Sequence, residues 1–169
     1  MGQKGTDRPR KSIRFRTDKL VCPTALLLLV SVSAGQQAEI DKIRNIIRTY
    51  EKSIGAADTA LASEIWSTTA DVSFIHPLGH EHGWEQIKRN VYEKLMRDLF
   101  SERQLTARDI EVHVYQDAAW AEFNWVFTAK QRSDGKAVKT EGRETQVYRK
   151  TDSGWRIVHV HYSAMPGTQ

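Results

Sequence analysis

Three side chains that lie far apart in the sequence could together perform acid–base chemistry. Glu144 lies in a strand-like stretch, residues 139–149, and a carboxyl group removed from water would have a raised pKa there. His76 ends a short β-prone segment, and Tyr162 lies in the last one. We expect His76 or Glu144 to act as the general base and Tyr162 as a hydrogen-bond donor. A base of this kind needs only geometry and a tuned pKa, so no cofactor is expected.

A predicted hairpin brings Glu144 beside a row of aromatic residues. The dipeptide at residues 134–135 is Asp-Gly, which favours a two-residue turn between paired strands. If these are the two central turn residues, Phe123 faces Gln146 and Trp125 faces Glu144. Directly opposed residues share a face of the sheet. We therefore expect the aromatic row to form the buried, concave face together with Glu144 and Gln146.

The residues expected around the resulting pocket are mostly aromatic. A concave apolar pocket with few polar groups is the usual form of a small-molecule site. An alternative reading of Glu144 and Gln146 is a structural hydrogen-bonded pair at the pocket rim, because perturbed buried groups mark functional sites only in some proteins. The predicted pocket residues are Phe74, Trp84, Phe123, Trp125, Phe127, Gln146 and Tyr148.

Histidines at alternate positions raise the question of a metal site. His80 and His82 lie in a predicted loop near His76, and imidazole ligands suit zinc. Closed zinc sites need four ligands, however, and the spacing fixes no third one. No metal site is therefore predicted.

The facing of the last strand depends on a register that the sequence leaves open. One register places Val158, Val160 and Tyr162 inward, and the other places His159 and His161 inward. We favour the first, because valines suit a core better than histidines do. The two histidines would then lie on the outer face, in a dimer interface.

The elements that must position these residues come as helices first and strands later. Apolar residues at steps of three and four predict helices, the first closed by Gly55 and the second capped by Asp58. Residues 78–83 are expected to form a loop. The order predicts an α+β fold, a cone-shaped curved antiparallel sheet wrapped on three N-terminal helices. Helices are expected at residues 38–55, 58–66 and 84–100, and strands at residues 72–76, 108–116, 118–130, 139–149 and 155–163.

The N-terminal segment has the pattern of a secretory signal. A basic stretch is followed by apolar residues 20–34, which end in the small-residue pattern Val32-Ser33-Ala34. This apolar stretch is shorter than the roughly 20 residues of a membrane span. We therefore expect a cleaved signal peptide at residues 1–34, a domain at residues 35–169, and a periplasmic or secreted protein with no membrane contact after cleavage. The alternative is an uncleaved N-terminal anchor.

Charge and cysteine content exclude two further classes of protein. The 169-residue chain has a formal net charge of +4, but residues 1–34 contain seven basic and two acidic residues. The rest of the chain then has 18 basic and 19 acidic residues, a net charge of −1. No nucleic-acid partner is expected, because binding to phosphates needs a basic surplus. The single cysteine, Cys22, precedes the domain, which therefore contains no disulfide.

Two C-terminal strings carry a resemblance to a known family. Residues 142–150 read Gly-Arg-Glu-Thr-Gln-Val-Tyr-Arg-Lys, and residues 154–163 read Gly-Trp-Arg-Ile-Val-His-Val-His-Tyr-Ser. The chain resembles the association domain of calcium/calmodulin-dependent protein kinase II and its bacterial SnoaL-like relatives, in the nuclear-transport-factor-2-like superfamily. The resemblance implies this fold and a homodimer through the outer face of the sheet. It implies little about chemistry, because the fold hosts enzymes and binding modules alike.

The resemblance also suggests which ligand to expect. The kinase association domain lines its cavity with arginines, whereas the matching positions here are Trp125, Gln146 and Tyr162. We therefore expect a small hydrophobic or aromatic ligand, handled by cofactor-independent isomerase, dehydratase or cyclase chemistry. The alternative is a non-enzymatic dimerisation or association module, for which the outward-facing Trp120 would provide a partner surface.

Overall fold

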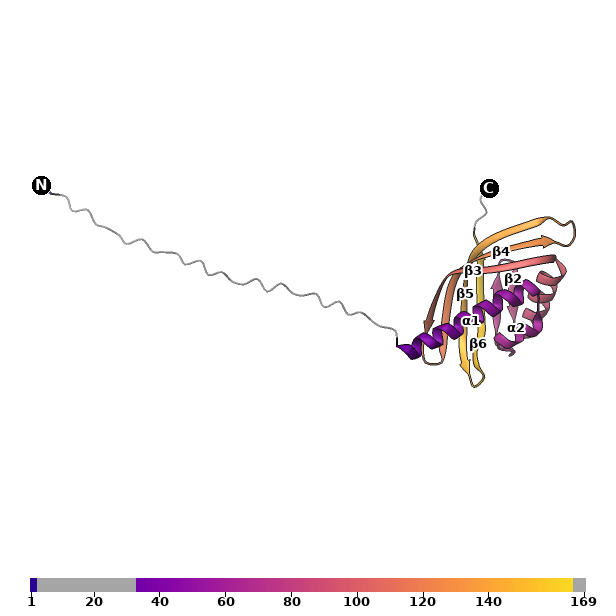
Figure 1. Cartoon of the computed structure of the whole chain (residues 1–169), viewed down its shortest axis with the longest axis horizontal. Coiled ribbons are helices and arrows are strands. Elements are labelled where there is room, and N and C mark those ends of the chain that lie inside the picture. Colours follow the sequence, from indigo (N-terminus) through magenta and orange to yellow (C-terminus); the bar gives the residue numbers. More distant parts are fainter. Residues whose placement is uncertain (3–32, 166–169) are drawn as a thin grey trace. The chain divides into compact units, whose positions relative to one another are not determined.

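The computed structural model describes residues 1–2 and 33–165 of the chain (Figure 1). Almost all of the predicted signal peptide, residues 1–34, lies outside the described residues, so export and cleavage stay predictions. Among the described residues, no helix combines the length and the apolar character needed to cross a membrane.

The first helix is longer than the sequence predicts. Helix α1 spans Ala34–Ala56, so Gly55 does not close it. The helix ends at Ala56, and the next residue, Ala57, adopts the left-handed conformation with a φ of 50°. The apolar spacing gives the predicted buried face, which consists of Ile43, Ile47, Tyr50 and Ile54.

The third predicted helix is mostly a π-helix. A short α3 (Trp84–Gln86) continues directly into η1 (Ile87–Asp98), which ends two residues before the predicted end. A π-helix bonds residues five apart and is therefore wider than an α-helix. The fourfold spacing of apolar residues still holds as far as Leu95: Ile87 and Val91 are buried, and Leu95 is half-buried. Leu99, the next residue in the series, lies beyond the helix and is 53% exposed.

The sheet has six strands in the order β2-β1-β6-β5-β4-β3 and is curved, which confirms the α+β fold class (Figure 1). The predicted antiparallel pairing holds except between β1 and β6, which are parallel. Residues 79–82 form a strand instead of the predicted loop, and the third strand begins eight residues earlier than predicted. The strands are β1 (Ser73–His76), β2 (Gly79–His82), β3 (Phe100–Val114), β4 (Ala118–Gln131), β5 (Ala137–Thr151) and β6 (Gly154–Ala164).

The register of β4 against β5 differs from the predicted one by two residues. Phe123 lies opposite Glu144 and Trp125 opposite Gly142, so the predicted pairing of Phe123 with Gln146 is wrong. The cause is a loop that is longer than a two-residue turn. Since strand faces alternate with a period of two, a shift of two residues leaves every side chain on its predicted face. Phe123, Trp125 and Glu144 are accordingly all buried.

A β-bulge decides the facing of β6. Residues 157 and 159 pair with consecutive residues of β5, which leaves Val158 as the extra residue. Ile157 is therefore fully buried on the inner face, and the prediction that Val158 faces inward is wrong. Val160 and Tyr162, beyond the bulge, face inward as predicted. The two residues that alternate with them on the outer face are His159 and His161.

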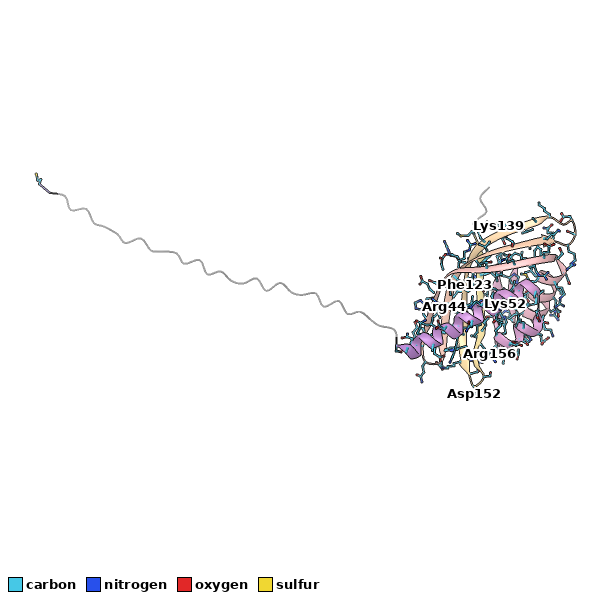
Figure 2. The ribbon with its side chains drawn as sticks, in the orientation of Figure 1. Arg44, Lys52, Phe123, Lys139, Asp152 and Arg156 are labelled. Atoms are coloured by element: carbon cyan, nitrogen blue, oxygen red, sulfur yellow. The ribbon has the colours of Figure 1, made fainter. Side chains whose placement is uncertain are left out.

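Helix α1 crosses the sheet and is fixed to it near both ends (Figure 1). Near its start, the Trp155 indole N–H donates to Glu39 Oε2 at 2.6 Å. Near its end, the backbone N–H of Ala107 in β3 donates to Glu51 Oε1 at 2.6 Å. Arg44 and Lys52 lie on the exposed side of the helix (Figure 2). The opposite side of α1 therefore faces the concave surface of the sheet.

Replacing Asp58 by alanine should lower the free energy of unfolding by about 0.5–2 kcal/mol. As the sequence predicts, Asp58 caps α2 (Thr59–Ile65): its Oδ1 accepts hydrogen bonds from the backbone N–H groups of Ala60 at 2.9 Å and Leu61 at 3.0 Å. Ser63→Ala in the exposed part of this helix is the control and should change stability by less than about 0.5 kcal/mol. Denaturant titration measures both variants, and equal effects would contradict the capping role.

Candidate functional site

A cavity of about 270 Å³ lies between the inner face of the sheet and helices α1 and η1. Its wall is largely apolar. Among the residues that the structure describes, Glu144 is the one acidic residue in the wall, and no Lys, Arg or His lines it. The helices contribute Tyr50, Ile54, Leu95 and Met96, the turn between β1 and β2 contributes Pro77 and Leu78, and the strands contribute Phe100, Leu105, Trp125, Phe127, Val138, Thr140, Glu144, Tyr162 and Ala164.

Glu144 is only 4% exposed and is held by its own strand. Gln146 Nε2 donates to Glu144 Oε1 at 2.6 Å, and the Tyr148 hydroxyl donates in turn to Gln146 Oε1. Loss of water raises the pKa of Glu144 to about 8, although Gln146 and the Tyr50 hydroxyl lower it in part. The carboxyl group is therefore mostly protonated at neutral pH. Glu144 and Gln146 thus form the hydrogen-bonded pair of the alternative interpretation, and Glu144 also borders the cavity.

Two tyrosine hydroxyls accompany Glu144 in the cavity wall. Burial, together with the neighbouring Glu144, raises the pKa of Tyr162 to about 12. Burial also raises the pKa of Tyr50 well above its usual value, and Glu144 adds to this effect. Both hydroxyls therefore stay protonated throughout the physiological range and can donate hydrogen bonds.

His76, Tyr162 and Glu144 lie in one row across the inner face of the sheet. Glu144 is the pairing partner of Tyr162. The His76 ring stacks on the Tyr162 ring, with centroids 6.2 Å apart and an interplanar angle of 13°. Tyr162 and Glu144 line the cavity, whereas His76 lies behind Tyr162 and is not part of the wall. The structure thus brings the three predicted residues together, but only two of them border the cavity.

His76 has polar neighbours that the sequence analysis misses. Its Nε2 lies 3.4 Å from Glu81 Oε1, and Asn90 Nδ2 donates to Glu81 Oε2 at 2.5 Å. His76 Nδ1 is buried without a hydrogen-bond partner among the described residues. Glu81 is missed because its segment reads as a loop. In the structure β2 pairs it with Phe74, and the two residues therefore share the inner face.

The other predicted pocket residues divide into three groups. Trp125 and Phe127 line the cavity. Phe74 and Trp84 instead pack against Trp66, with ring centroids 6.0 Å and 6.4 Å away. They belong to the core beside the cavity. The remaining three, Phe123, Gln146 and Tyr148, are buried on the inner face of the sheet but form no part of the cavity wall.

Several wall residues have no specific signal in the sequence. Tyr50 and Ile54 follow the apolar spacing of α1, and Met96 lies in η1. This spacing predicts burial but cannot tell a cavity wall from a packed core. Leu105 lies in the part of β3 that the sequence does not predict as a strand.

The outer face of the sheet carries most of the remaining notable side chains. Trp120 is half-buried, and its ring stacks on His113 with centroids 4.0 Å apart and an interplanar angle of 14°. The rings of His80 and His82 lie 3.9 Å apart. Within residues 33–165, no group of three or more His, Cys, Asp or Glu side chains has a metal-binding arrangement.

The raised pKa of Glu144 predicts that stability falls as pH rises. The folded chain holds this proton up to about pH 8, whereas the group has an ordinary pKa of 4.5 in the unfolded chain. The unfolded state is therefore favoured increasingly between these two values. Denaturation of the wild type across this range should show a loss on the order of a few kcal/mol, which Glu144→Gln removes. Glu141→Gln, at an exposed position of the same strand, should keep the wild-type profile; identical profiles for all three proteins would contradict the assignment.

Comparison with known proteins identifies the family. Residues 43–167 match the model of the SnoaL-like domain. A nuclear transport factor 2 (NTF2-like) superfamily protein from Salmonella enterica serovar Typhimurium has a solved structure that is 44% identical to this chain. The match has a TM-score of 0.75 and covers 79% of this chain and 95% of that chain. A search of curated proteins gave no match.

More distant solved structures share the fold alone. A hexachlorocyclohexane dehydrochlorinase (LinA) type 2 has a TM-score of 0.66 at 14% identity, covering 78% of this chain and 92% of that chain. The association domain of C. elegans CaMKII has a TM-score of 0.62 at 21% identity, covering 78% and 99%. These likenesses agree with the family match over most of the described residues. The chain is thus a member of the SnoaL-like domain family within the NTF2-like superfamily.

Proposed function

We propose that this protein binds a small, neutral, largely apolar molecule in the cavity, and that Glu144 transfers a proton to or from it without a cofactor. The observation that carries the proposal is a 4%-exposed carboxyl group with a pKa of about 8 in a largely apolar wall. A cavity of this kind with a few polar groups is the usual form of a small-molecule site.

The pKa of Glu144 suits both directions of proton transfer. A group that titrates near the working pH can act as an acid or as a base. When protonated, Glu144 can give its proton to a leaving hydroxyl group. When ionised, it can remove a proton from a carbon next to a carbonyl group. The Tyr162 and Tyr50 hydroxyls can stabilise the negative charge that develops on the ligand. Isomerisation, dehydration and cyclisation all fit this set of groups.

His76 takes a supporting part in this proposal. It lies behind Tyr162, and its ring is stacked on the tyrosine ring while Glu81 faces its Nε2. Glu144 rather than His76 is therefore the proposed proton carrier, because Glu144 borders the cavity. His76, Glu81 and Asn90 would fix the orientation of the Tyr162 ring.

Glu144→Gln should abolish proton transfer while keeping the shape of the site. The protein is incubated in D₂O with a panel of neutral cyclic ketones and hydroxyketones of the cavity's size, and NMR follows deuterium incorporation and loss of hydroxyl groups. We expect the catalysed rate to fall at least about 100-fold in Glu144→Gln and to stay unchanged in Glu141→Gln. A wild-type rate in the Glu144→Gln variant would exclude this residue as the proton carrier.

A second candidate function, non-enzymatic dimerisation, is favoured by the outer face of the sheet. Trp120 and His113 form a stacked pair on adjacent strands there, and both belong to the face opposite the cavity. Aromatic rings that are half-exposed on an outer face can form part of a partner surface. The CaMKII association domain, which shares the fold, is an association module by name.

Sedimentation of the 35–169 domain tests this candidate. At micromolar concentration the wild type should sediment as a dimer, and Trp120→Ser should shift it to a monomer because the aromatic contact is lost. Glu144→Gln, on the opposite face, should leave the dimer intact. A wild-type monomer at this concentration would count against a dimer through the outer face.

A further inference from the structure

The cavity wall changes from buried to exposed along strand β5. Alternate residues of a strand share a face, so Glu144, Gly142 and Thr140 follow one another along the inner face. Glu144 is only 4% exposed, whereas Thr140 is an exposed residue that still lines the cavity. The cavity therefore has a buried end at Glu144 and opens to solvent near Thr140.

The turn between β1 and β2 lies at the same open end. Strand β6 ends at Ala164, which is exposed and also lines the cavity. The parallel pairing of β1 with β6 aligns Ile75 with His161. Continued along both strands, this register brings the turn, Pro77 and Leu78, to the end of β6, and both turn residues line the cavity.

Leu78 is an exposed leucine at this opening. Although it lines the cavity, it is 79% exposed, whereas Tyr50 and Glu144 at the buried end are 2% and 4% exposed. A leucine side chain in water forgoes the stabilisation that burial of its apolar surface would give. A molecule that reaches from the buried end to the opening would cover this surface.

The base of the turn is fixed, although its tip is exposed. The turn follows His76, whose Nε2 lies 3.4 Å from Glu81 Oε1 on β2. Asn90 of η1 donates to Glu81 Oε2 at 2.5 Å, which connects the β1–β2 hairpin to a helix of the cavity wall. The His76 ring also stacks on Tyr162. These contacts hold Leu78 at the opening without using its own side chain.

We propose that Leu78 closes over the outer end of a bound molecule, and that the site therefore favours neutral ligands with an apolar tail that reaches from Glu144 to the opening. This inference rests on the proposed function, because it takes the cavity as the ligand site. It adds the shape of the ligand and a residue that determines specificity. Leu78 would contact only those ligands that are long enough to extend beyond the buried end.

Two ketones that differ only in an alkyl tail test this role. Acetophenone and para-butylacetophenone share an aromatic ketone, and only the second carries a butyl tail. Their dissociation constants are measured by NMR titration for the wild type and for Leu78→Ser, Leu78→Met and Leu99→Ser. In Leu78→Ser the ratio of the two constants should shift against para-butylacetophenone by about threefold to tenfold, because the tail loses an apolar contact.

The other two variants are matched controls. Leu78→Met keeps a long apolar side chain at the opening and should keep the wild-type ratio. Leu99→Ser replaces an exposed leucine that does not line the cavity, and it should leave the ratio unchanged. A shift in Leu99→Ser as large as that in Leu78→Ser would overturn the specific role of Leu78.

The outcomes separate this role from the proposed function. If both ketones bind and the ratio in Leu78→Ser equals that of the wild type, the role of Leu78 is overturned and the cavity remains a ligand site. If neither ketone binds at millimolar concentration, both proposals fail. If Leu78→Ser instead changes the sedimentation of the protein and leaves the ratio unchanged, the leucine belongs to a contact between copies of the chain, and the proposal is again overturned.

Discussion

Burial of the Glu144 carboxyl group is the constraint on which the inner face of the sheet depends. A charged carboxylate in such surroundings is strongly unfavourable, so the group must keep its proton or find partners. Strand β5 itself supplies such partners, because alternate residues of a strand lie on the same face. Gln146 donates to Glu144, and Tyr148 donates to Gln146. Helix α1 adds Tyr50 from the other side of the cavity. The elements that bury the carboxyl group therefore also supply hydrogen bonds that favour its ionised form, and these offset part of the effect of burial on its pKa.

The sequence predicts which residues lie on the inner face even where the predicted register is wrong. An error of two residues in the register leaves every side chain on the same face, and only an odd error moves it to the other face. The predicted β4–β5 pairing is wrong by two residues, yet Phe123 and Glu144 still share the inner face. An extra single residue does change faces, as the bulge at Val158 shows by turning Ile157 inward. Val158 and Val160 have the alternating apolar spacing of an ordinary strand, so nothing in the sequence indicates the bulge.

The cavity itself could not be predicted in the same way, because tertiary packing sets the separation of its walls. Tyr50 and Met96 read as ordinary residues of amphipathic helices, whether or not they touch an open space. Gly142 does carry a signal, since a glycine inside a strand indicates a close approach of another group. Only the observed register shows that this group is the Trp125 ring. The sequence thus indicates a close approach at Gly142 without showing that the Trp125 ring is the group that approaches.

The two candidate functions use opposite faces of the same strands and are physically compatible. On β4, Trp125 faces the cavity while Trp120 faces outward, so a partner on the outer face would leave the cavity wall intact. Covering that face would also remove the outer side of β4 and β5 from water. Openings of the sheet that admit water to Glu144 would then become rarer, because they would require the partner to move as well. Association would in this way help to keep the pKa of Glu144 high, as the proposed proton transfer requires.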